Sequence, residues 1–355
     1  MIKNKITAFK ILFKAFFKRL KILSSKQKCI AYIGGHGHNN YGDDVMFNIL
    51  EQYLRGQGYQ LITIHSFGIE KTLRHFKLSG PSFFKKIILG GGTLINDMWY
   101  YKVESLLKLN VPIVALGTGV GSCGLEQNKQ IDFLKWKTAL NVFEEVNVRG
   151  EISQKRLLSI DVKSNVVGDL ALLNGKIEVS KASRKKIVLN LMNIKEYNSF
   201  WESLIPKLKS LINEGWEIVP LVLNPIDKDY TKEYFEKLDV HGDFSLVKNE
   251  EEFLNIINEA SFSICVRLHG AVLTTIENIP TILFGYRDKC LDYMGSIGQK
   301  RFYINLDNIS VDQFNFDVLL EDLVDVESNF EVRKIINSRV LDHKNTIISH
   351  LKKIL

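Results

Sequence analysis

Short apolar runs alternate with amphipathic stretches along the chain from Cys29 onward, and this rhythm restricts the fold more than any other feature. Helical spacing of apolar residues separates several of the runs, as in Val45–Leu54 and Asn128–Val142. Strands that alternate with helices are typical of a parallel, doubly wound sheet. The strands expected in the first half are Cys29–Ile33, Gln60–His65, Lys86–Leu89, Pro112–Leu116, Glu145–Val148 and Asn165–Val167.

The same rhythm restarts after a polar, Lys-rich stretch at residues 176–186, which predicts a linker. A length of 355 residues also suits two domains. We therefore predict an α/β protein with two Rossmann-like domains, at residues 29–175 and 187–325, and a C-terminal helix over 326–355. The strands expected in the second half are Lys186–Leu191, Glu217–Leu223, Phe244–Val247, Phe262–Val266, Thr281–Phe284 and Arg301–Asn305. Helices are expected before the C-terminal one at Ser199–Asn213, Tyr230–Leu238, Glu250–Ala260 and Leu268–Glu277.

Hydrophobicity and cysteine usage narrow the class of protein further. No apolar run approaches the ~18 residues that cross a bilayer. The four cysteines are scattered and form no CxxC pair, so we expect buried thiols in a reducing cytoplasm, with neither a disulfide framework nor a zinc site.

Residues 1–28 form a basic arm. Nine basic residues and no acidic residue occur in this segment, while the whole chain carries +7, so the remainder has a net charge of −2. The apolar residues of the arm recur at spacings of three and four, which predicts an amphipathic helix. They are Ile2, Ile6, Phe9, Phe13, Phe16, Leu20 and Leu23.

Such a helix suits an anionic membrane surface, with aromatic side chains among the lipids and lysines on the headgroups. We therefore expect a cytoplasmic protein attached peripherally to the inner face of the cytoplasmic membrane. Packing of the helix on its own protein, or on a second subunit of a homo-oligomer, stays open as an alternative. Nucleic acid is not expected as a partner, because the body of the chain supplies no further basic stripe.

Three glycine-rich turns follow strands of the first half, at residues 34–44, 90–94 and 117–122. Glycines let a backbone approach a ligand closely, and exposed N–H groups at such turns suit an anion. The candidate substrate-binding residues in these turns are Asn40, Asp43, Gly91, Gly92 and Gly119. His36 and His38 stand near acidic residues, but a turn this rich in glycine does not fix ligand geometry, and no metal site is expected.

Cationic side chains also follow strands. Arg149 comes directly after one strand, and Arg267 closes another in the sequence Arg267-Leu268-His269-Gly270. A helix N-terminus, a guanidinium and an imidazole would converge there on one anion. Tyr286 and Lys289 follow the next strand and add a second cation.

The order and spacing of these pieces resemble the polysaccharide pyruvyl transferase family, over about residues 30–295. The set also includes Glu151 and Ser153 after Arg149, and Gly168-Asp169. Two departures are a Gly between Arg149 and Glu151, where the family usually has Arg-Asp or Arg-Glu, and the absence of the usual proline after Gly168-Asp169.

The resemblance implies a GT-B-like protein that transfers a pyruvyl group from phosphoenolpyruvate to a sugar of a bacterial surface polysaccharide or its lipid-linked precursor. The product is a ketal, and no cofactor is needed. It also implies that the N-terminal domain is the acceptor side and the C-terminal domain the donor side. Arg267 and His269 become the catalytic candidates, since the pKa of a histidine lies near 7. Arg149, Lys289, Tyr286 and Gly270 become substrate-binding candidates.

Two other classes compete with this interpretation. A GT-B-type glycosyltransferase would use a nucleotide sugar, and such enzymes commonly hold the ribose with a glutamate on the helix after the donor loop. The nearest acid here is Glu277, at the far end of that helix, which disfavours a nucleotide. A non-catalytic membrane adaptor is disfavoured by the intact set of Arg267, His269 and Lys289.

Overall fold

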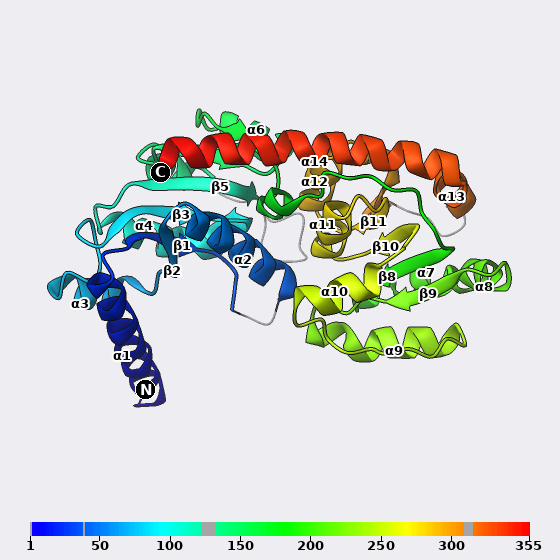
Figure 1. Cartoon of the computed structure of the whole chain (residues 1–355), viewed down its shortest axis with the longest axis horizontal. Helices are drawn as coiled ribbons and strands as arrows, with labels where there is room; N and C mark the ends of the chain where they lie inside the picture. Colours follow the sequence, from blue (N-terminus) through cyan, green and yellow to red (C-terminus); the bar gives the residue numbers. More distant parts are fainter. Residues whose placement is uncertain (1, 38–39, 122–132, 309–314) are drawn as a thin grey trace. The chain divides into compact units, whose positions relative to one another are not determined.

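The structure is a computed structural model that describes residues 2–37, 40–121, 133–308 and 315–355 (Figure 1). The chain forms two compact units. Unit 1 comprises Met1–Gly34, Phe47–Leu170 and His350–Leu355, and unit 2 comprises Gly35–Met46 and Ala171–Ser349. The short segment 35–46 therefore belongs to unit 2, which the sequence pattern did not indicate.

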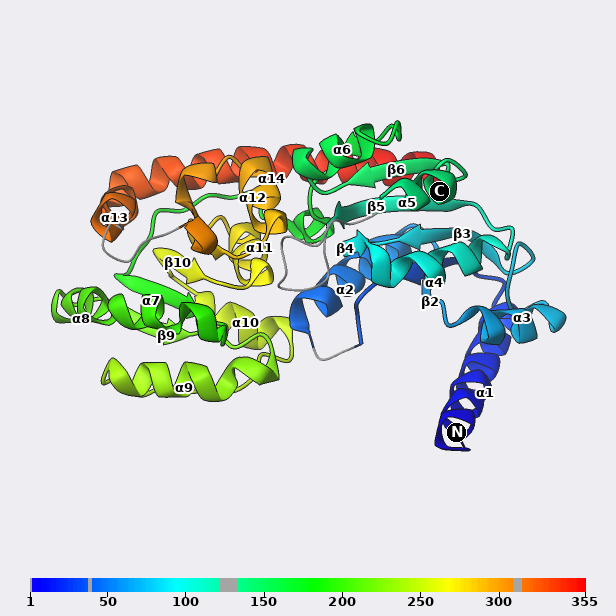
Figure 2. The same cartoon turned by 180° about the vertical axis from the view of Figure 1, so that it is seen from behind.

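Unit 1 is built on sheet A, whose seven strands pair in parallel in the order β2-β1-β3-β5-β6-β7, with β4 also paired to β5. The inner strands are buried along nearly their whole length, as expected for a parallel sheet with helices on both faces. Figures 1 and 2 show α2 on one face of sheet A and α4 on the other. The strands are β1 (Lys28–Ile33), β2 (Tyr59–Thr63), β3 (Phe84–Leu89), β4 (Gly92–Ile95), β5 (Ile113–Val120), β6 (Glu145–Val148) and β7 (Asn165–Val166).

The helices of unit 1 begin and end where the sequence supplies local signals. Asn96 caps α4 by accepting a hydrogen bond from the Trp99 N–H at 3.1 Å. The helices are α1 (Ile2–Ser24), α2 (Tyr41–Gly56, shared with unit 2), α3 (Phe67–His75), α4 (Asp97–Leu107), α5 (Leu134–Leu140) and α6 (Glu151–Leu158).

The basic arm is helix α1, and it packs on unit 1 through one face. Arg19 is fully buried there, and its guanidinium pairs with the buried Glu70 of α3 at 2.7 Å. The remaining residues of this face are Leu12, Ala15, Phe16 and Ile22. The N-terminal end of α1 extends away from sheet A (Figure 1).

Four residues of the predicted apolar stripe of α1 are exposed, together with Phe17, which the prediction did not include, whereas the side chains of Ile2 and Ile6 lie outside the described part of the chain. Phe13 and Phe17 expose 56% and 52% of their surface, and their rings lie 4.6 Å apart. Phe9, Leu20 and Leu23 are exposed as well, whereas Phe16 is partly buried. No helix that the structure describes combines the length and the hydropathy needed to cross a membrane.

Unit 2 is built on sheet B, a second parallel sheet with the order β12-β11-β10-β8-β9. Helix α11 packs on β10 and β11 and is buried on nearly every side. The strands are β8 (Lys186–Asn190), β9 (Glu217–Pro220), β10 (Phe262–Cys265), β11 (Thr281–Gly285) and β12 (Tyr303–Asn305). The helices are α7 (Asn198–Ser203), α8 (Ile205–Asn213), α9 (Lys228–Lys237), α10 (Glu250–Ile257), α11 (Leu268–Ile276), α12 (Asp288–Ser296), α13 (Phe316–Val324) and α14 (Val326–Ile354), the last ending in unit 1.

Three sequence expectations differ from the observed elements. The expected strand at 244–247 makes only an isolated bridge between Val222 and Leu246. The expected helix over 199–213 is divided into α7 and α8, because Pro206 opens a new helix in the first turn of α8. The third glycine of the turn at 90–94 begins strand β4. Part of the expected helix over 128–142 lies outside the described residues, and α5 represents the rest.

Candidate functional site

The site of unit 2 is assembled around the first turn of α2 and the first turn of α11. A Cβ atom on Gly42 would overlap the imidazole ring of His269, so only glycine allows this approach. His269 is the second residue of α11, and its side chain keeps 15% of its surface exposed. The close contact with His269, a catalytic candidate, thus explains why the first glycine-rich turn has a glycine at position 42.

Asp43 lies beside His269 in this arrangement. One of its carboxylate oxygens, Oδ1, is 3.7 Å from His269 Nε2, and the other, Oδ2, accepts a 2.6 Å hydrogen bond from the Asn40 side-chain amide. Burial raises the pKa of Asp43 above its ordinary value, and the Lys289 ammonium opposes this shift. A carboxyl group with a raised pKa beside an imidazole is suited to proton transfer.

Arg267 occupies the N-cap position of α11, and its side chain is held by a carboxylate that the sequence analysis did not single out. Its Nη2 donates a 2.9 Å hydrogen bond to Asp227 Oδ1, and its Nε pairs with Asp227 Oδ2. Asp227 is 1% exposed, whereas the Arg267 side chain is 15% exposed. Nη1 of Arg267 makes no hydrogen bond with any residue in the described part of the chain, so this end of the fork is open to an anion.

Asn190, at the end of β8, fixes the backbone around Arg267. Its Oδ1 accepts a 3.1 Å hydrogen bond from the Arg267 N–H, and its side-chain amide donates to the Leu221 carbonyl at 2.8 Å. A Cβ on Gly270 would stand 2.8 Å from Asn190 Oδ1. Gly270 is therefore needed for the close packing of α11 on β8.

Tyr286 and Lys289 follow β11, as the sequence indicates. Tyr286 is buried, with the Lys289 ammonium 5.9 Å and the Arg287 guanidinium 5.3 Å from its ring centroid. Lys289 is half-buried in the first turn of α12 and acts electrostatically on Asp43. The two residues therefore belong to the same unit as His269 and Arg267.

The remaining site candidates belong to unit 1. Arg149 follows β6 and is 1% exposed, and its Nη1 lies 3.6 Å from the buried Asp169. Its Nη2 donates to the Thr93 hydroxyl at 3.4 Å, and a Cβ on Gly119 would stand 2.7 Å from that same nitrogen. Gly119 thus makes room for the buried guanidinium.

The other glycines in the glycine-rich turns of unit 1 are explained by different local causes. Gly91 is buried, and Gly92 has a φ of 93°, a left-handed conformation that favours glycine. Cβ atoms on Gly34 or Gly90 would overlap the ring of Tyr32, so these two glycines serve internal packing.

The structure groups some predicted residues and separates others by unit. Asn40, Asp43, His269, Arg267 and Lys289 gather in unit 2, whereas Arg149 and the three glycines of the later turns belong to unit 1. His38, one of the two histidines considered for a metal site, lies outside the described residues.

Asp227 and Asn190 were missed by the sequence analysis. Asn190 is the last residue of β8, and Asp227 ends the short turn 225–227 that comes after β9. A search for acids and amides directly after strands would therefore have missed both.

Two parallel α/β sheets, each with polar residues at its carboxyl edge, define a two-domain, GT-B-like protein. A model of the family described as polysaccharide pyruvyl transferase matches residues 40–288. The chain therefore belongs to the polysaccharide pyruvyl transferase family, and the resemblance in its motifs is confirmed. A search of the curated proteins found no match.

Solved structures support the fold. A UDP-GlcNAc 2-epimerase from Neisseria meningitidis bound to UDP-GlcNAc has a TM-score of 0.54 and 11% identity, covering 92% of this chain and 100% of that one. The S. aureus MnaA–UDP co-structure gives 0.52 and 12%, covering 93% and 98%. Acinetobacter baumannii MurG gives 0.50 and 9%, covering 90% and 95%. At such identities the likeness shows the fold alone, and the predicted fold class is confirmed.

Proposed function

We propose that the protein transfers a pyruvyl group from phosphoenolpyruvate to a sugar of a bacterial surface polysaccharide or its lipid-linked precursor, and that it does so without a cofactor. The observation that carries the proposal is the family match, which spans the segment holding Asn40, Asp43, Arg267 and His269. Phosphoenolpyruvate carries a phosphate and a carboxylate. The open Nη1 of Arg267 and the ammonium of Lys289 suit these anions.

Asp227 has a positioning role in this proposal. It occupies the Nε and Nη2 side of the Arg267 guanidinium and so directs the Nη1 side toward the donor. A lysine at position 267 could not reproduce this arrangement, because an ammonium has no planar fork.

The reaction needs one proton on the donor and two hydroxyls from the sugar. The methylene carbon of phosphoenolpyruvate takes a proton and becomes the methyl group, while one sugar hydroxyl adds to C2. A second hydroxyl then displaces phosphate from C2 and closes the ketal, and its proton leaves with the phosphate or to solvent. The His269–Asp43 pair is placed to supply and remove these protons.

Arg149 contributes from unit 1. Since its guanidinium is buried against Asp169 and Thr93, we assign it the task of holding the turns around Gly119 and Gly92 within unit 1. The alternative donor, a nucleotide sugar, gains no support from the helix after Arg267. Glu277 stands at the far end of α11 and pairs with Lys176.

The proposal is tested by incubating the protein with phosphoenolpyruvate and a glycan acceptor and measuring phosphate release. His269→Gln should lower turnover by roughly 10²–10⁴-fold. The matched control is His241→Gln, because His241 is exposed on a loop of the same unit. Release of a nucleotide from a nucleotide sugar, with no use of phosphoenolpyruvate, would replace the proposed donor.

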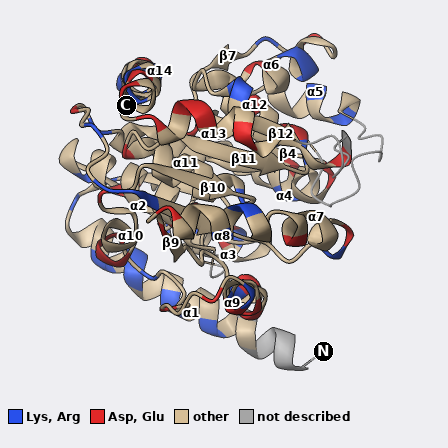
Figure 3. Ribbon diagram, turned by 90° about the vertical axis from the view of Figure 1, so that its right-hand side faces the viewer, with Lys and Arg blue, Asp and Glu red and all other residues tan. Residues whose placement is uncertain are grey.

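The localisation is a second part of the proposal. Helix α1 carries the exposed Phe9, Phe13 and Phe17 together with exposed lysines, including Lys10, Lys14 and Lys18. No acidic residue lies on this helix, which bears only Lys and Arg among its charged residues (Figure 3). This combination suits an anionic bilayer surface rather than a neutral protein partner. The buried Arg19–Glu70 pair attaches the helix to unit 1, so a bound helix would hold unit 1 at the membrane.

Vesicle co-sedimentation tests this attachment in the full chain. Phe13→Ser with Phe17→Ser should weaken binding to anionic vesicles by more than about tenfold, since each exposed ring would otherwise enter the interface. Leu158→Ser with Ile226→Ser, at two other exposed apolar positions, is the control. Binding should also fall with salt. The membrane is rejected as the partner of α1 if both double variants bind anionic vesicles equally. It is also rejected if the unaltered protein forms a dimer that only the phenylalanine variant loses.

A further inference from the structure

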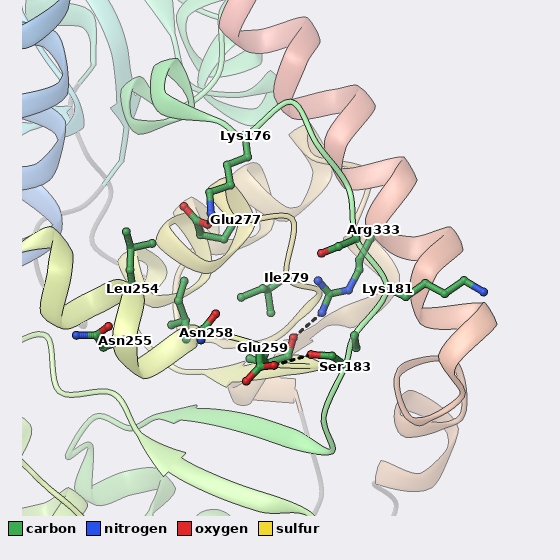
Figure 4. A pocket seen from close by; sticks show the side chains of 14 residues that line it. Lys176, Lys181, Ser183, Leu254, Asn255, Asn258, Glu259, Glu277, Ile279 and Arg333 are labelled. Atoms are coloured by element: carbon green, nitrogen blue, oxygen red, sulfur yellow. Dashed lines mark hydrogen bonds and ion pairs between the residues drawn. The ribbon is translucent and has the colours of Figure 1, made fainter.

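Unit 2 contains a pocket at the opposite end of α11 from His269. Its volume is about 490 Å³, and it lies between the segment 176–183, the end of α10, the loop after α11 and helix α14 (Figure 4). Glu277, which follows the last residue of α11, belongs to the lining. Because Glu277 lies eight positions after His269 along α11, about 12 Å of helix separates the two residues.

Arg333 of α14 forms part of the pocket wall. The residue is 4% exposed, and its Nη2 donates to the carbonyls of Ala260 and Ser261 at 2.5 and 2.9 Å. Its Nε donates to Asn329 Oδ1 at 2.8 Å. Nη1 makes no hydrogen bond with any residue of the described ranges, and Figure 4 shows the guanidinium directed toward the pocket.

Among the residues that the structure describes, no carboxylate balances the charge of Arg333, unlike the other charges of the lining. Glu277 pairs with Lys176, and Glu259 pairs with the neighbouring Arg184 at 2.9 Å. Lys181 pairs with Glu327 and points away from the pocket in Figure 4. Burial lowers the pKa of Arg333 to about 10, which reflects the cost of an uncompensated buried cation.

The rest of the lining is suited to hydroxyl groups. Ser180, Ser183, Asn255 and Asn258 supply hydroxyls and side-chain amides, and Ile279 adds an apolar wall. These amides and hydroxyls can both donate and accept hydrogen bonds, as sugar hydroxyls require. The volume falls in the range of small-molecule sites, about 300–1,000 Å³.

We propose that this pocket binds a phosphorylated, hydroxyl-rich small molecule of the sugar phosphate class, with its phosphate on Nη1 of Arg333. The phosphate supplies the missing counter-charge, and the serines and asparagines hold the hydroxyls. This is a second anion site, separate from the donor site around Arg267.

Hydrogen–deuterium exchange of the full chain, with glucose 1-phosphate as the probe and glucose as its uncharged counterpart, tests the proposal. Glucose 1-phosphate should slow exchange in residues 176–183 and 254–260, and glucose should not. Arg333→Gln should weaken probe binding by about 10- to 100-fold, the loss expected for a charge-assisted hydrogen bond.

A second variant keeps the test decisive if Arg333→Gln does not fold. Asn255 is exposed in the last turn of α10, and Asn255→Asp adds a negative charge to the lining of the pocket. It should weaken binding about 3- to 10-fold. Asn213→Asp, in the exposed last turn of α8, is the matched control and should bind as the unaltered protein does.

Two outcomes would overturn the proposal. One is protection confined to residues 35–46 and 267–289, with none in the pocket segments. The other is equal affinity of the Asn255 and Asn213 variants for glucose 1-phosphate.

Discussion

Arg267→Ala should lower both the affinity for the donor and the stability of unit 2. The Arg267 side chain faces the predicted anion and also neutralises a buried acid, Asp227. Asp227 is 1% exposed and receives two contacts from the Arg267 guanidinium. Removing one partner of a buried pair costs about 3–5 kcal/mol, since the other charge is left uncompensated. For a folding unit of about 190 residues this lowers the melting temperature by roughly 6–20 °C, at about 2–4 °C per kcal/mol.

A double-mutant cycle separates the two effects. Arg267→Ala with Asp227→Ala removes both charges and should recover part of the lost stability, as measured by the transition of unit 2 in calorimetry. Phosphoenolpyruvate affinity, measured by titration calorimetry, should stay low in the double variant. A single variant as stable as the unaltered protein would show that the pair is not buried as described. A double variant with normal donor affinity would remove Arg267 from the donor site.

Three further predictions follow from the same contacts. Asp43→Asn should raise the melting temperature at neutral pH and lower turnover. Because the pKa of Asp43 is raised in the fold, its charged form destabilises the fold at pH values above about 3.8, the ordinary pKa of this carboxyl group. Gly42→Ala should cost about 1–3 kcal/mol and impair turnover by displacing His269, whereas Gly56→Ala, at the open end of the same helix, should do neither. Glu70→Gln should cost about 3–5 kcal/mol of unit 1 stability in urea by leaving its buried arginine unpaired. The stability difference between Glu70→Gln and the unaltered protein should shrink below about pH 4.5. Burial raises the pKa of Glu70, but the hydrogen bonds and the arginine charge outweigh burial, so the pKa is lowered in the fold. The stability that ionised Glu70 contributes is therefore lost as the pH falls through this lowered pKa.

The strands of the two sheets could be predicted from the sequence because burial on both faces leaves a continuous apolar run, as in β1 and β8. Strand β4 was missed because Gly92 reads as a turn, whereas its left-handed backbone opens a strand. The sequence pattern also failed over residues 199–213, where one helix was expected and two are present. The split of α7 from α8 depends on Pro206.

In the candidate site, too, some residues could be predicted from the sequence and others could not. Residue types at strand ends were enough to single out Arg267 and His269, since ligand-binding residues gather at the carboxyl ends of parallel strands. The carboxylate partner of Arg267 stands 40 positions away, in a short turn whose place beside α11 depends on the tertiary fold. Position on a helical wheel likewise could not reveal that Arg19 lies on the buried face of α1, because its partner Glu70 belongs to a separate helix.

The most direct test of the central claim is mass spectrometry of the acceptor glycan after incubation with phosphoenolpyruvate. We expect the glycan to gain one pyruvate less one water, with one phosphate released for each ketal formed. Both signals should fall together in His269→Gln and persist in His241→Gln. A glycan that gains a hexose from a nucleotide sugar, or phosphate release without any change in the mass of the glycan, would contradict the account.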